Sequence, residues 1–168
     1  RLFAEGSFNA AFVPSYSSEL ATKRNNAKRF ANDVFNILIL GLLILIVIIE
    51  IFMPTFIYLI APGFYEDQSK LELTTLLTRI TFPFLLFISM ASFFSAILNS
   101  NNKFGIAAAA PIILNIILIF ILYLSKKTDD NLVVYLSYGV SIAGLVQLIF
   151  VYHFAKKYFS PNFNFKIK

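Results

Sequence analysis

Cysteine and tryptophan are absent from this chain of 168 residues, and histidine occurs once. Without cysteine the chain can form neither a disulfide framework nor a thiolate metal site. Zinc sites need three or four clustered ligands, which the single His153 cannot supply. The sequence also offers no Gly-rich phosphate loop and no nucleophile with a nearby histidine base. We therefore expect no metal, no cofactor and no enzymatic activity.

Charged residues are also scarce. They make up 14% of the chain, against about 25% in an average soluble domain, whereas 58% of the residues are hydrophobic. Mean hydropathy is +0.76. Residues 80–98, 104–124 and 132–152 carry no charged side chain, and each range is long enough to cross a bilayer, which takes about 20 apolar residues. With its flanks, a fourth apolar run covers residues 34–53. We predict a membrane span over each of these four ranges.

The predicted spans are typical of helices rather than strands. Inside hydrocarbon every backbone N–H and C=O group must be bonded within the protein, and a membrane barrel would show short alternating strands instead of solid apolar blocks. The sequence therefore predicts an all-α integral membrane protein that forms a polytopic helix bundle. In such a protein the net charge of +5 is no sign of nucleic-acid binding, because what matters is which loops hold the basic residues.

Basic residues are distributed unevenly over the segments between the spans. Four of them lie in one set of segments: Lys70, Arg79, Lys126 and Lys127. Nine lie in the other set: Lys23, Arg24, Lys28, Arg29, Lys103, Lys156, Lys157, Lys166 and Lys168. Cytoplasmic loops carry an excess of Lys and Arg. We therefore expect residues 15–33 to form a cytoplasmic basic loop and residues 153–168 a cytoplasmic basic segment.

Prolines and small residues indicate where the helices bend or approach one another. Pro54 is expected to end or kink the first span, which leaves residues 55–60 as an apolar segment too short to cross. Pro83 and Pro111 lie inside spans and are candidate bend points, because each lacks a backbone N–H. Gly139 and Gly144 would let helix backbones come close, and packing is their simplest role.

A polar stripe opens the chain. Arg1, Glu5 and Asn9 are spaced four residues apart, so they share one face if this segment is helical. Two interpretations remain open. The stripe can lie in the headgroups as part of an interfacial amphipathic helix. Alternatively it faces a partner or a water-filled cavity, since an arginine at the bilayer centre costs about 2.5 to 3.5 kcal/mol on insertion scales.

The polar side chains deeper in the chain have simpler explanations. Asn115 and Gln147 lie within spans, where interhelical hydrogen bonding is the default role and substrate contact the minority one. Glu50 lies near the outer end of its span and is expected to be solvated or locally paired, and Arg79 to reach the headgroups. Tyrosines near the span ends, Tyr16 among them, are typical of an aromatic belt.

Four blocks of sequence resemble one family. Residues 1–14, RLFAEGSFNAAFVP, closely resemble the signature R-x-F-A-E-G-x-F-x-x-A-F-V-P of the MurJ (MviN) family of bacterial lipid II flippases. Residues 61–64 (APGF) and 80–83 (ITFP) resemble the family in the same order. They are followed by residues 96–99 (AILN), then Phe104, Ala110, Pro111 and Asn115. One minor departure is Ala107, where the family often has proline.

The resemblance implies more about architecture than the residues alone. Family members look like bundles of about fourteen membrane-spanning helices in the multidrug/oligosaccharidyl-lipid/polysaccharide exporter superfamily. Residues 1–168 would then be a fragment, part of the N-terminal lobe of one transporter domain. Residues 1–14 would be the end of a charged cavity helix. The resemblance implies that Arg1 and Glu5 face this cavity and bind substrate, and Asn9 is a further candidate on the same stripe.

The implied activity is transport by alternating access. A cationic cavity would take lipid II, a polyprenyl-pyrophosphate-linked glycan, from the cytoplasmic leaflet of the bacterial inner membrane and release it outside. Its partners would be this substrate, membrane lipids and the rest of its own chain, and not nucleic acid. Two alternatives stay open: another exporter of the superfamily, which moves a different lipid-linked sugar or a drug, or a membrane scaffold or lipid-modifying enzyme that shares only the apolar helices.

Overall fold

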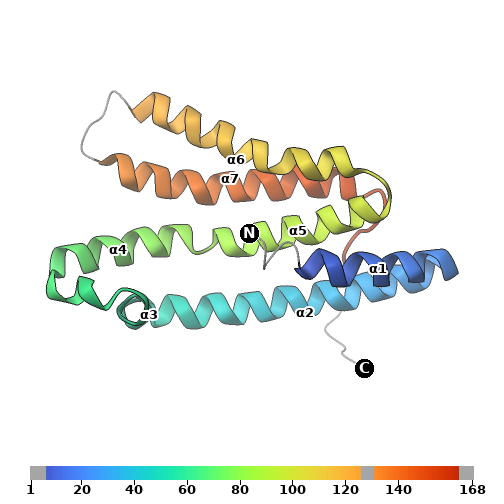
Figure 1. Cartoon of the computed structure of the whole chain (residues 1–168), viewed down its shortest axis with the longest axis horizontal. Coiled ribbons are helices and arrows are strands. Elements are labelled where there is room, and N and C mark those ends of the chain that lie inside the picture. The colour runs from blue at the N-terminus through green and yellow to red at the C-terminus, as the bar shows by residue number, and fades with distance from the viewer. Residues whose placement is uncertain (1–6, 126–130, 163–168) are drawn as a thin grey trace.

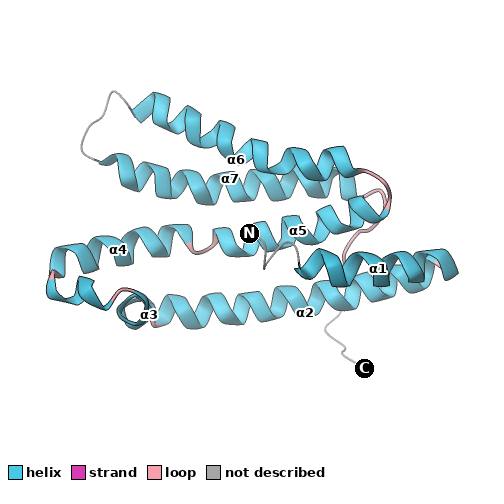
Figure 2. Cartoon of the chain, viewed as in Figure 1, coloured by secondary structure: helices cyan, strands magenta, loops and turns pink. Residues whose placement is uncertain are grey.

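The computed structural model describes residues 7–125 and 131–162, and every regular element in this part is a helix (Figure 2). The helices follow one another in this order: α1 (Ser7–Thr22), α2 (Arg24–Ile51), α3 (Met53–Ile60), the short 3₁₀ helix η2 (Pro62–Glu66), α4 (Gln68–Thr81), α5 (Phe84–Ser100), α6 (Phe104–Ser125) and α7 (Leu132–Ala155). The all-α prediction is confirmed for this part of the chain.

The long helices form three rows in Figure 1. Helices α6 and α7 lie side by side in the first row, α4 and α5 lie end to end in the middle row, and α1 lies beside the start of α2 in the third row. Helix α7 packs on both α5 and α6, whereas α1 packs on α2 and α5. Helix α5 is therefore the central element, with neighbours on both sides.

Among the described residues, four helical stretches are long and apolar enough to cross a membrane: Arg24–Ile51, Gln68–Ser100, Phe104–Ser125 and Leu132–Ala155. Their number agrees with the four predicted spans. Along α2 the side chains of Ile37, Ile44 and Ile51 are exposed. A soluble monomer rarely exposes such a continuous apolar surface, whereas a membrane span presents it to lipid.

The structure differs from the expected loop over residues 15–33. Helix α1 continues through Pro14 to Thr22, and after Lys23 helix α2 begins at once at Arg24. Rings four residues apart explain the continuation: Phe12 stacks on Phe8 with ring centroids 5.3 Å apart, and on Tyr16 with centroids 5.4 Å apart. Such pairs stabilise a helix across a proline that removes only one backbone donor. Tyr16 is 2% exposed, so it belongs to the core and not to an interfacial belt.

The prolines act largely as expected. Helix α2 ends at Ile51, and α3 begins with Pro54 in its first turn and is seen nearly end-on in Figure 1. Pro83 lies in the break between α4 and α5. At this break the hydroxyl of Ser141 in α7 donates to the carbonyl oxygen of Ile80, so a backbone acceptor there has a side-chain partner. By contrast, α6 runs unbroken through Pro111.

The corner between α3 and α4 is fixed by Asp67, which caps α4. Its Oδ1 atom accepts hydrogen bonds from the Ser69 hydroxyl at 2.6 Å and from the Lys70 backbone N–H at 3.2 Å. The Lys70 ammonium lies 2.9 Å from Oδ2. These bonds, that from Ser69 above all, lower the pKa of Asp67 to about 2 because they favour the charged carboxylate. The corner is therefore polar and well capped.

Glycines in α7 allow close helix packing, as predicted. A Cβ atom added at Gly144 would lie 2.5 Å from a ring carbon of Phe84 and 3.3 Å from Cβ of Phe87. At Gly139 it would collide with the side chain of Ile121. The first contact brings α7 against α5 and the second brings it against α6, so the packing of α7 on these two helices depends on missing side chains.

Six phenylalanines join α1, α2 and α5 to the segment after α7. We call this set the aromatic core: Phe8, Phe12, Phe35, Phe93, Phe94 and Phe159. The ring of Phe93 lies at its centre, with centroid distances of 5.2 to 6.2 Å to the other five. Phe93 is fully buried. Tilted and edge-on contacts of this kind add stabilisation beyond the buried area alone.

The segment after α7 packs against α2. Phe159 is buried in the aromatic core. The backbone N–H of Asn162 donates to Oδ1 of Asn32 at 2.7 Å, and the Asn36 amide donates to the carbonyl oxygen of Asn162 at 3.4 Å. The sequence indicated only a basic tail here, whereas residues 156–162 are held in place by one ring and two amides.

We predict that Phe93→Ala destabilises the protein by about 3 to 5 kcal/mol, because it leaves a cavity among five rings. The thermal midpoint of the purified protein in detergent measures the loss. Phe120→Ala is the matched control, since Phe120 is 60% exposed on α6 and faces away from the bundle. An equal fall in the midpoint for both variants would contradict the central role of Phe93.

Candidate functional site

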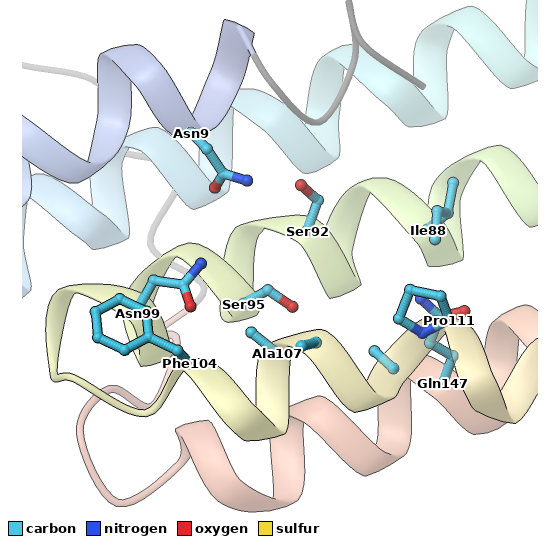
Figure 3. A pocket seen from close by; sticks show the side chains of 11 residues that line it. Asn9, Ile88, Ser92, Ser95, Asn99, Phe104, Ala107, Pro111 and Gln147 are labelled. Carbon is cyan, nitrogen blue, oxygen red and sulfur yellow. The ribbon is translucent and has the colours of Figure 1, made fainter.

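A cavity of about 310 Å³ lies between α1, α5, α6 and α7 (Figure 3). We call it the polar pocket. Eleven residues line it: Asn9, Ile88, Ser92, Ser95, Asn99, Phe104, Ala107, Ala108, Ala110, Pro111 and Gln147. Its volume lies at the lower end of the range of about 300 to 1,000 Å³ typical of small-molecule sites. None of the lining residues is charged.

Helix α5 supplies most of the polar lining. Ser92, Ser95 and Asn99 are spaced so that they share one helical face, and Figure 3 shows them on successive turns of α5 around the pocket. The opposite wall is the start of α6, where Ala107 and Ala108 leave room because their side chains are small. Sequence reasoning missed this serine and asparagine stripe, although its helical spacing was a readable signal.

Three polar atoms of the pocket lining lack a partner. Oδ1 of Asn9, Oγ of Ser92 and Oε1 of Gln147 are buried and form no hydrogen bond with the described residues. Leaving a buried polar atom unpaired costs about 1 to 3 kcal/mol. These atoms come from three different helices, yet they meet at one cavity. The pocket is thus suited to a ligand that presents hydroxyl or amide groups.

A backbone oxygen adds to this polarity. Pro111 lies inside α6 and has no N–H group, so the carbonyl of Ala107, four residues earlier, lacks its usual helical donor. Both residues line the pocket. Within residues 7–125 and 131–162 no cluster of His, Asp or Glu side chains could hold a metal ion. The arrangement can therefore bind and orient a polar group, and the described lining offers no acidic or basic side chain that could activate the hydroxyls of Ser92 and Ser95.

The predicted site residues have different outcomes. Arg1 and Glu5 lie outside the described residues, whereas Asn9 lines the polar pocket. Gln147 is 3% exposed and also lines the pocket, and the interhelical hydrogen bond expected of its Oε1 atom is not formed within the described part. Asn115 is exposed on α6. The structure thus brings Asn9 and Gln147 together at one cavity and leaves Asn115 apart from them.

Glu50 and Arg79 form an ion pair away from the pocket. Oε2 of Glu50 lies 3.9 Å from Nε of Arg79, and both side chains are partly exposed. The pair joins the end of α2 to the end of α4. Of the two expectations for Glu50, solvated or locally paired, the structure shows the local pair. Partly exposed pairs contribute little to stability, about 0 to 1 kcal/mol.

The fold and the site define a class. Helices long enough to span a bilayer, with apolar outer faces and an uncharged polar pocket between them, are those of a multi-pass α-helical membrane protein. Comparison with known proteins narrows this class. A family model described as "Lipid II flippase MurJ" matches residues 1–167, and the chain belongs to this family.

Curated relatives agree with this assignment. The chain is 39% identical over 158 residues to a "Probable lipid II flippase MurJ" from Rickettsia prowazekii (strain Madrid E), which covers 94% of the chain and 31% of the relative. A protein of the same name from Rhizobium tropici is 43% identical over 90% of the chain and 30% of the relative. The chain thus spans about a third of the length of the curated relatives that it matches.

We predict that Gln147→Leu raises the thermal stability of the ligand-free protein. Leucine has a similar size and removes a buried amide whose Oε1 atom has no partner among the described residues, so the free energy of unfolding should rise by about 1 kcal/mol and the thermal midpoint by about 2 to 4 °C. Asn115→Leu makes the same chemical change at an exposed position and should leave the midpoint almost unchanged. A lower midpoint for Gln147→Leu would show that the amide is satisfied.

Proposed function

We propose that the chain forms part of a flippase that moves lipid II, a precursor of peptidoglycan, across the bacterial inner membrane. The observation that carries this proposal is membership of the MurJ family over residues 1–167. The polar pocket supports it, because a membrane scaffold has no need for unpaired polar atoms buried among its helices. The partners in this role are lipid II, the surrounding lipids and the rest of the protein's own chain.

Movement of the substrate is an electrostatic problem. A pyrophosphate in hydrocarbon carries a large desolvation penalty, which a fixed guanidinium in a water-filled cavity reduces. We assign this role to Arg1, with Glu5 to orient it and Asn9 as a neutral hydrogen-bonding neighbour. The polar pocket beside Asn9 would then receive uncharged hydroxyl and amide groups of the glycan and peptide. No covalent bond is made or broken in this mechanism.

Transport by alternating access has a direction, so the orientation of the protein in the membrane matters. The distribution of the basic residues predicts which loops face the cytoplasm. The beginning of α2, the turn between α5 and α6 and the segment after α7 carry nine basic residues, against four in the other segments, and would face the cytoplasm. The α3–α4 corner and the connection between α6 and α7 would face outward.

Single cysteines test this orientation, because residues 1–168 contain no native cysteine and add no labelling background of their own. In intact cells that carry the full-length protein, an impermeant thiol reagent should label Ser69→Cys and Asn131→Cys. It should not label Asn26→Cys or Asn102→Cys until the membrane is opened. Labelling at position 26 together with protection at position 69 would reverse the orientation.

Substitutions of Arg1 test the substrate site. In the full-length protein Arg1→Ala should abolish complementation of a flippase-depleted strain. Arg1→Lys should be only partly active, because lysine keeps the charge but lacks the planar fork that binds phosphate bidentately. Glu5→Gln should reduce activity if the carboxylate orients Arg1.

Membrane abundance is the control for these variants, because loss of folding would mimic loss of binding. Lys103→Ala removes a cation from an exposed turn and should complement fully. If Arg1→Ala reaches the membrane at the parental level and supports growth as well as the parent, Arg1 does not bind the substrate. In that case the interfacial interpretation of the polar stripe holds.

A further inference from the structure

A second cavity, of about 330 Å³, lies where α2 begins and α7 ends. We call it the basic cleft. Four cations line it, Lys28 and Arg29 from α2 and Lys156 and Lys157 from the segment that follows α7. One carboxylate, Asp33, lines it as well. The cleft is separate from the polar pocket, with which it shares no lining residue.

Packing forces these cations together. Lys156 and Lys157 lie between Ala155, the fully buried last residue of α7, and Phe159, which is held in the aromatic core. The hydrogen bond from the N–H of Asn162 to Asn32 fixes the same segment against α2. The two lysines therefore cannot move away from α2 without loss of buried contacts.

The positive charge of the cleft is not balanced by the protein. Within the described part of the chain none of the four cations lies within ion-pair distance of a carboxylate, Asp33 included. Like charges held close together repel one another, and a bound anion removes this repulsion. Asn32 adds a neutral donor to the lining, since its Oδ1 atom accepts from Asn162 and its amide N–H₂ group remains.

The position of the cleft indicates which anion fits. The candidate spans that begin at Arg24 and end at Ala155 both meet the membrane surface here. Lipid phosphates lie at this depth, and basic pockets between spanning helices bind anionic headgroups. We propose that the basic cleft binds the phosphate of an anionic phospholipid. This site is independent of the proposed transport activity.

Binding of a short-chain phosphatidylglycerol to the purified full chain, in nanodiscs of phosphatidylcholine at low salt, tests the proposal. Lys156→Gln with Lys157→Gln should weaken binding by roughly 25-fold, because each basic residue near a membrane surface contributes about fivefold. Asp33→Asn should instead tighten binding by about fivefold, because it removes the one carboxylate among the described residues that line the cleft. Opposite effects of neighbouring substitutions cannot arise from misfolding.

Two controls decide whether the site is specific. Lys23→Gln with Lys103→Gln removes two cations that do not line the cleft, and binding should stay close to the parental value. Equal weakening by this pair, or no tightening by Asp33→Asn, would overturn the proposal. Inorganic phosphate should compete poorly, because it lacks the acyl chains that the adjacent apolar helices contact. Displacement by equimolar inorganic phosphate would make the ligand a soluble anion and refute the lipid assignment.

Discussion

The contacts of the Phe93 ring hold the described bundle in its observed arrangement. This ring touches α1 through Phe12, α2 through Phe35 and the segment after α7 through Phe159. Because α1 is fixed against α5 in this way, Asn9 reaches the polar pocket. Because Phe159 is fixed against α5 and α2, the basic cleft closes around its four cations. Both candidate sites therefore depend on one set of apolar contacts. Of the six rings in the aromatic core, Phe159 alone also lines a site, the basic cleft.

Hydropathy and proline positions predicted the spans and their breaks, because both signals are local and act through the backbone. The end of α2 before Pro54 and the break at Pro83 needed no knowledge of neighbouring helices. Tertiary contacts decided the rest. Continuation of α1 past Pro14 depends on stacked rings, and nothing local in the sequence placed Phe159 against Phe93. That Asn9 and Gln147 line the same cavity could not be predicted from the sequence either, because it depends on how α1 and α7 are rotated relative to each other.

Polarity and charge occupy different depths of the molecule. Deep among the helices, the pocket lining is made of amides, hydroxyls and a freed carbonyl, which can be buried at moderate cost. Full charges stand at the helix ends, where water and headgroups solvate them. This division explains why the described core tolerates unpaired oxygen atoms but contains no buried ion pair. It also means that any ligand charge in the membrane interior must be met by groups outside the described residues.

The ion pair between Glu50 and Arg79 has a consequence for how the protein fits its bilayer. About 30 Å of helical rise separates Arg79 from Ser100, which equals the typical hydrocarbon thickness. The stretch Gln68–Ser100 is longer than that, so an untilted arrangement would leave its first turns outside the hydrocarbon. In the orientation proposed above, the pair would lie at the boundary between acyl chains and headgroups. The first turns of α4, together with Asp67 and η2, would then stand in the aqueous layer, and a thicker membrane would have to thin locally to avoid covering two charges.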